Sequence, residues 1–143
     1  RKTYFMTAPH NHMRRVLRAL ADSTAAPRHW KTVLMLLILA VSYLALTPKP
    51  PEMMDTGWDK LNHALAFAVL AFSANLSYPA APNRWIYVLL ALFVYGGLIE
   101  ILQTFVPGRA GEWGDLVADT VGIACGAITA TTMRRVASVR PSR

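Results

Sequence analysis

Four apolar stretches, separated by loops rich in proline and glycine, constrain this chain more than any other feature. They cover residues 32–46, 60–78, 84–106 and 115–133. At about 1.5 Å of rise per residue, helices of this length reach across most of a hydrocarbon layer that is about 30 Å thick. Only 16% of the 143 residues are charged, which is less than a water-soluble domain of this size usually carries. The sequence therefore predicts an all-α, polytopic membrane protein with four transmembrane helices.

The positions of the basic residues predict how these helices are oriented. Eleven of the fifteen Lys and Arg residues lie in residues 1–31 and 134–143. Segments rich in Lys and Arg stay in the cytoplasm, so we expect both tails to be cytoplasmic. Residues 32–133 would then form a multi-pass domain in a bacterial cytoplasmic (inner) membrane. The basic tails suit membrane lipids as partners, and because no folded basic module is present, we predict no nucleic-acid partner.

The N-terminal tail contains one further pattern. Residues 11–21 place apolar side chains at helical spacing with arginines between them, which fits either a short basic amphipathic helix on an anionic membrane or a disordered tail. The apolar stretch that follows resembles a signal peptide but lacks a small-residue cleavage site, so we interpret it as a retained anchor. The single cysteine, Cys125, is expected to be a small buried residue.

In this orientation, the loops over residues 47–59 and 107–114 face outward, and polar residues from three stretches collect at the outer surface. Polar groups in or beside lipid are costly, so their convergence predicts a ligand-binding site. The eight candidate residues are Asp59, Lys60, His63, Glu100, Gln103, Arg109, Asp115 and Asp119.

Several of these residues also have structural interpretations. Asp59 and Asp115 can cap the helices that they begin. Glu100 lies in an otherwise apolar helix, where a lone carboxylate costs on the order of 3 kcal/mol. It therefore needs a partner, and an ion pair with Arg109 or Lys60 is the structural alternative to a functional role. The planar guanidinium of Arg109 also suits a phosphate or a carboxylate.

Small residues recur at every fourth position of the last stretch, at Ala118, Gly122, Gly126 and Ala130. This spacing lets helices pack closely in lipid, and Gly96 and Gly97 of the third stretch are the expected contact.

Three patterns of these residues together resemble the VanZ-like family. The patterns are Asp59-Lys60-x-x-His63-x-x-x-Phe67-x-x-Leu70, Glu100-x-x-Gln103-x-Phe105-x-Pro107-Gly108-Arg109 and Asp115-x-x-x-Asp119-x-x-Gly122-x-x-x-Gly126. The family comprises small bacterial integral membrane proteins and is named for a teicoplanin-resistance protein. The resemblance implies a cell-envelope protein with a link to glycopeptide resistance, and it implies no particular reaction. Two positions depart from the family pattern: Phe67 replaces a common aromatic hydroxyl, and Asp119 replaces a common amide.

The leading functional hypothesis is a protein that binds an amphiphilic cell-envelope ligand at the outer leaflet. The ligand would be a lipid-linked cell-wall precursor or a lipoglycopeptide. Arg109, Lys60 and His63 would hold its phosphate or carboxylate. Sugars or polar head groups would be oriented by Glu100, Gln103 and Asp119. No cofactor and no resident metal ion are part of this hypothesis.

Two alternatives stay open. The first is a membrane-embedded enzyme acting on a lipid-linked substrate, with Glu100 and His63 as the acid–base candidates. Asp115 and Asp119, together with Glu100 and His63, could in that case bind a divalent cation. The second alternative is a small helper subunit whose stripe of small residues packs against a partner protein in a larger membrane complex.

Overall fold

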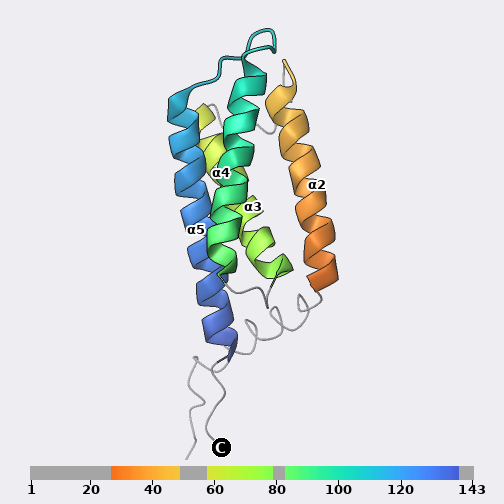
Figure 1. Ribbon diagram of the computed structural model, residues 1–143, viewed down its shortest axis with the longest axis vertical. Helices are drawn as coiled ribbons and strands as arrows, with labels where there is room; N and C mark the ends of the chain where they lie inside the picture. The colour runs from red at the N-terminus through yellow and green to blue at the C-terminus, as the bar shows by residue number, and fades with distance from the viewer. Residues whose placement is uncertain (1–26, 49–57, 79–82, 139–143) are drawn as a thin grey trace, which may run out of the picture.

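The computed structural model describes residues 27–48, 58–78 and 83–138. This part of the chain forms four α-helices and contains no strand (Figure 1). The helices are α2 (Pro27–Leu46), α3 (Asp59–Ser77), α4 (Arg84–Gln103) and α5 (Trp113–Ser138). The all-helical prediction is confirmed, and each apolar stretch forms one helix. The proposed amphipathic helix over residues 11–21 lies outside the described residues.

The four helices form an up-and-down bundle. In Figure 1, α2 and α4 run in one direction and α3 and α5 run in the opposite direction. The first residue of α2 and the last residue of α5 therefore lie at the same end of the bundle. Helix α3 contacts each of the other three helices, whereas α2 and α5 make no contact with each other in the described part of the chain. Because α3 runs opposite to α4, the first turn of α3 lies at the end of the bundle where α4 finishes.

Three helices are long and apolar enough to cross a membrane, namely α2, α4 and the Trp113–Val136 part of α5. Helix α3 carries more polar residues, and its central position explains how it tolerates them. Asn75 and Ser77 are buried, and their side chains donate to the backbone carbonyls of Ala71 and Ser73 one turn earlier. Polar groups that are bonded in this way can be buried at little cost.

The core lies where α3 meets α4 and α5. It is formed by Phe67, Leu70, Ala71, Ala74, Val88, Leu92, Ile99 and Ile123. Large apolar side chains are also exposed on every helix, including Leu36, Leu65, Leu90 and Val121. Outward-facing apolar side chains are typical of helices that contact lipid rather than water. Helix α2 contributes no fully buried residue, so it lies at the edge of the bundle.

The stripe of small residues on α5 packs against α3. A Cβ atom on Gly122 would overlap the carbonyl oxygen of Ala64, and one on Gly126 would overlap that of Ala68. The predicted close packing is therefore confirmed, and these two glycines pack against α3, whereas Gly96 of α4 lies against Asp119 of α5. Glycine at these two positions of α5 brings the α3 and α5 backbones together, as in other close helix pairs.

The two glycines of α4 have different surroundings. A Cβ atom on Gly97 would meet no other atom within 4 Å, whereas one on Gly96 would lie 2.6 Å from the Asp119 carboxylate. Cys125, expected to be buried, is instead exposed. It lies directly before Gly126 in the chain, so it faces away from the contact with α3.

Candidate functional site

Seven polar side chains gather at the end of the bundle where α3 and α5 begin and α4 ends. We call them the polar cluster: Asp59, Lys60, His63, Glu100, Glu112, Asp115 and Asp119. Six of the seven were predicted from the sequence. The antiparallel arrangement of the helices brings them together, because the N-terminal turns of α3 and α5 lie beside the last turn of α4 (Figure 1).

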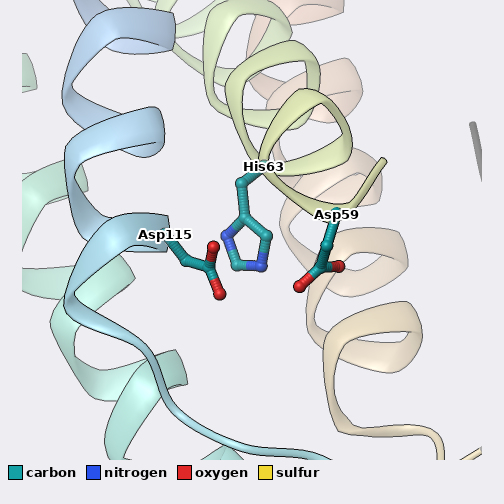
Figure 2. Close-up of side chains that lie close together, drawn as sticks. All are labelled: Asp59, His63 and Asp115. Carbon is teal, nitrogen blue, oxygen red and sulfur yellow. The ribbon is translucent and has the colours of Figure 1, made fainter. Parts of the chain in front are cut away.

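His63 lies at the centre of the polar cluster. Its Nδ1 atom is 2.9 Å from Oδ1 of Asp119 and 3.8 Å from Oε1 of Glu100. Figure 2 shows its imidazole ring between the carboxylates of Asp59 and Asp115. The side chains of His63 and Glu100 are almost buried, and that of Asp119 is fully buried. One imidazole is therefore surrounded by four carboxylates from three helices.

Two of these carboxylates are incompletely bonded. Oε1 of Glu100 and Oδ2 of Asp119 are buried and have no hydrogen-bond partner within residues 27–48, 58–78 and 83–138. Leaving a buried polar atom without a partner costs about 1–3 kcal/mol. Gly96 provides the space for the Asp119 carboxylate, since a side chain at this position would collide with Oδ2. The described side chains alone therefore do not satisfy the polar cluster.

Lys60 and Glu112 hold the loop before α5 against α3 and α4. The Lys60 ammonium is 3.0 Å from Oε2 of Glu112 and 3.4 Å from Oδ1 of Asp115. The backbone N–H of Glu112 donates to Oε2 of Glu100 at 2.7 Å. Glu112 was missed from the sequence because it lies between the pattern that ends at Arg109 and the pattern that begins at Asp115. The sequence feature that could have indicated Glu112 is its position in the same short glycine-rich loop as Arg109.

The other two predicted site residues, Gln103 and Arg109, bond to the end of α2. Arg109 donates from Nη2 to the carbonyl of Leu44 at 3.1 Å and from Nε to that of Thr47 at 3.3 Å. Gln103 donates from Nε2 to the carbonyl of Ala45 at 3.1 Å. The last carbonyls of a helix have no partner within the helix, so these bonds complete the C-terminus of α2. Gln103 and Arg109 make no bond to the polar cluster in the described part of the chain.

Asp59 and Asp115 do not cap their helices, and Glu100 does not form the ion pair considered for it. Trp58 is the N-cap of α3, and Asp59 follows it within the first turn. Asp115 is the third residue of α5, and its side chain pairs with Lys60 rather than capping the helix. Both carboxylates still lie in first turns, where the helix dipole favours negative charge. Glu100 pairs with neither Arg109 nor Lys60, because the Glu112 backbone and His63 occupy its carboxylate.

An apolar groove of about 490 Å³ lies between α4 and α5 and ends at the polar cluster. Glu100 and Glu112 line its polar end. The rest of its lining is Phe93, Val94, Gly97, Leu98, Ile101, Thr104, Gly111, Trp113 and Leu116. A groove with an apolar wall and a polar end fits a molecule with an apolar tail and a polar head.

Comparison with known proteins shows which family the chain belongs to. A model of the VanZ/LLP1 family matches residues 9–134, which is most of the chain. The chain belongs to the VanZ/LLP1 family. This confirms the family predicted from the three residue patterns. No curated protein and no solved structure matches the chain.

The polar cluster of this VanZ/LLP1 protein is acidic. It contains five carboxylates, one lysine and one histidine. Since like charges this close repel one another, the cluster favours a cation or the donor groups of hydroxyls and amines over a bare anion. Two sets of three residues could hold a metal ion, Asp59–His63–Asp115 and His63–Glu100–Asp119. In each set the potential ligand atoms lie within 4.8 Å of one another.

Proposed function

We propose that this VanZ/LLP1 protein binds an amphiphilic cell-envelope lipid at the outer leaflet of the bacterial cytoplasmic membrane. The observation that carries the proposal is the apolar groove between α4 and α5, which ends at Glu100 and Glu112. The lipid tail would lie in the groove and the head group would lie against the polar cluster. This placement separates the apolar and polar parts of the ligand as the membrane itself does.

The charge distribution of the bundle supports this orientation. The end opposite the polar cluster carries the basic residues Arg28, Lys31, Arg84, Arg134 and Arg135. Basic residues at one end of a bundle favour that end in the cytoplasm, so the polar cluster would face outward. The chain would cross the membrane four times, with the polar side of α3 packed against the other helices and its exposed apolar residues facing lipid, and both termini would be cytoplasmic.

The acidic character of the polar cluster suggests the chemistry of the head group. Carboxylates accept hydrogen bonds from hydroxyl and amine groups, which sugar and peptide head groups provide. A lipid-linked cell-wall precursor and a lipoglycopeptide of the teicoplanin type share this chemistry, since both combine an apolar chain with a sugar–peptide head. Binding either one would connect the site with glycopeptide resistance. Arg109 would support the loop and not hold the ligand, because its guanidinium bonds to the end of α2.

The proposal can be tested with a photoreactive glycolipid probe, an isoprenoid chain joined directly to a disaccharide, whose uncharged head group offers sugar hydroxyls to the carboxylates. The purified protein would be irradiated with the probe in detergent, and the labelled peptides would be mapped by mass spectrometry. We expect labelling at groove residues of α4 such as Leu98 and Ile101. Gly97→Leu should abolish this labelling, because a Cβ atom there meets no other atom within 4 Å and the rest of the leucine would fill the groove.

Ala91→Leu is the matched control, since residue 91 is an exposed position of α4 outside the groove. Labelling should persist in this variant. Equal labelling of both variants, or labelling spread over all exposed helix faces, would contradict the proposed groove.

A second candidate function is favoured by the pairing of His63 with Asp119. An imidazole oriented by a buried carboxylate is a common acid–base arrangement, and Glu100 lies on the same side of the ring. No serine or cysteine belongs to the polar cluster, which argues against a covalent acyl-enzyme. Turnover of the disaccharide probe to a new product would favour an enzyme over a binding protein. The helper-subunit alternative loses support, because the small residues of α5 that suggested it are occupied by α3.

A further inference from the structure

We infer that His63, Glu100 and Asp119 form a binding site for one divalent transition-metal ion. The leading hypothesis drawn from the sequence includes no resident metal, so this site is an addition to it. The inference does not rest on the proposed lipid binding, because ion binding can be measured without any lipid.

The spacing of the three side chains suits a metal centre. Two ligand atoms that are each about 2.0–2.2 Å from an ion lie roughly 3–4 Å from each other. The observed distances from Nδ1 of His63 are 2.9 Å to Asp119 and 3.8 Å to Glu100. The three residues come from α3, α4 and α5, so the bundle itself sets their separation. All three potential ligand atoms lie within 4.8 Å of one another.

The buried oxygens without partners provide an independent indication of a ligand. The Asp119 side chain has no exposed surface, and its Oδ2 atom lacks a hydrogen-bond partner within the described residues. Oε1 of Glu100 is also buried and without a partner there. Buried polar atoms in proteins are almost always bonded, so two orphaned oxygens beside one imidazole require an explanation. A cation bound by Oε1 of Glu100 and by both carboxylate oxygens of Asp119 would satisfy the two orphaned atoms and offset the like charges of the surrounding carboxylates.

The surroundings of the imidazole ring also match a metal-bound histidine. A histidine that binds an ion through one nitrogen usually donates its other N–H to a carboxylate, which fixes the ring and its tautomer. Figure 2 shows that Asp59 and Asp115 flank the His63 ring, so they could accept this bond when Nδ1 binds the ion. Binding the ion through Nδ1 requires the neutral imidazole with its single proton on Nε2, so a proton is released only when the imidazole of the ion-free protein is charged. Asp59 and Asp115 are thus positioning residues.

The donor set indicates the class of ion. One imidazole nitrogen with carboxylate oxygens suits borderline transition ions such as Zn²⁺ or Mn²⁺, whereas Ca²⁺ and Mg²⁺ are held by oxygen alone. Three protein ligands leave a coordination position open, as in zinc sites that bind water or substrate. Glu100 belongs both to this set and to the lining of the groove. The open position would therefore lie near the polar end of the groove.

The test uses the full chain in detergent, with its purification tag removed and bound ions stripped by EDTA. Zn²⁺ binding would be measured by titration calorimetry, and the bound ion would be counted by elemental mass spectrometry. Co²⁺ would report nitrogen ligation through its visible absorption spectrum. We expect about one ion per chain for the wild type. His63→Ala and Asp119→Asn should bind it at least roughly a hundredfold more weakly, and Asp59→Asn should bind it about tenfold more weakly.

Two controls keep the outcome clear. His29→Ala removes an exposed histidine of α2 at the opposite end of the bundle, and it should bind the ion as the wild type does. Gly96→Ala should weaken binding by displacing the Asp119 carboxylate, whereas Gly97→Ala should not. A folded wild type that binds no ion would overturn the inference. Binding that is unchanged in both His63→Ala and Gly96→Ala would also overturn it, because the ion would then be bound elsewhere.

Discussion

The two ends of the helical bundle bury polar side chains in different ways. At the end where α3 finishes, Asn75 and Ser77 donate to carbonyls of their own helix, and Arg134 of α5 donates to the carbonyls of Asn75 and Leu76. At the other end, the carboxylates of the polar cluster face one another around His63, and two of their oxygens lack partners in the described residues. The first arrangement completes the end of a helix, and one of its atoms, Nε of Arg134, is also buried without a partner in the described residues. The second calls for a cation or a ligand that the described side chains do not supply.

Removing Arg134 should give the largest loss of stability. Arg134→Ala deletes a charged donor from the carbonyls that end α3, at 2.9 and 3.4 Å. Hydrogen bonds from charged groups contribute about 1.5–3 kcal/mol, so we expect the free energy of unfolding to fall by about 2–3 kcal/mol. Unfolding in detergent, followed by circular dichroism, measures this change. Arg28→Ala, at an exposed position of α2, is the control, and an equal effect of both variants would contradict a specific role of Arg134.

Arg109→Ala should lower the free energy of unfolding by less than Arg134→Ala does. It removes two bonds to the end of α2, a helix without fully buried residues, so we expect a loss of about 1–2 kcal/mol. Binding of Zn²⁺ and of the photoreactive probe should stay close to that of the wild type, because Arg109 does not bond to the polar cluster. Loss of probe labelling in a folded Arg109→Ala protein would show that the guanidinium holds the ligand after all.

Glu100→Gln should change the free energy of unfolding least, and it should raise this free energy where the other two variants lower it. Replacing one of five clustered carboxylates with an amide of the same shape relieves repulsion, so the ligand-free protein should gain up to about 1 kcal/mol of stability. The same variant should lose stabilisation by Zn²⁺. Thermal unfolding in EDTA and in Zn²⁺ measures both effects. Destabilisation in EDTA would instead mean that Glu100 is a structural residue like Arg134.

The sequence predicted the helices and most of the polar cluster for simple physical reasons. Four long apolar stretches leave little choice but helices, three of which are long and apolar enough to cross a membrane, and their alternating direction places the start of α3 beside the end of α4. The distribution of basic residues then indicated which polar side chains share an end. His63, Glu100 and Asp119 could be grouped in this way without any knowledge of how the helices pack.

The partners of individual side chains were less predictable, because they depend on how the helices lie against one another. Arg109 looked like an anion ligand from its chemistry, but the end of α2 lies close enough to bond to it. The small residues of α5 could face α3 or α4, since their spacing marks a close contact without naming the neighbour. Glu112 enters the polar cluster because the loop before α5 folds back over Glu100.

We predict that the polar cluster binds a metal ion or a lipid head group, which the described part of the chain does not supply. Native mass spectrometry of the wild type and of Glu100→Gln, both released gently from detergent after expression in bacterial membranes, tests it most directly. The wild-type protein should retain a metal ion, an isoprenoid-linked lipid or both, and Glu100→Gln should retain less of each. Identical spectra for the two proteins, with only the bare chain and bulk phospholipid, would contradict it.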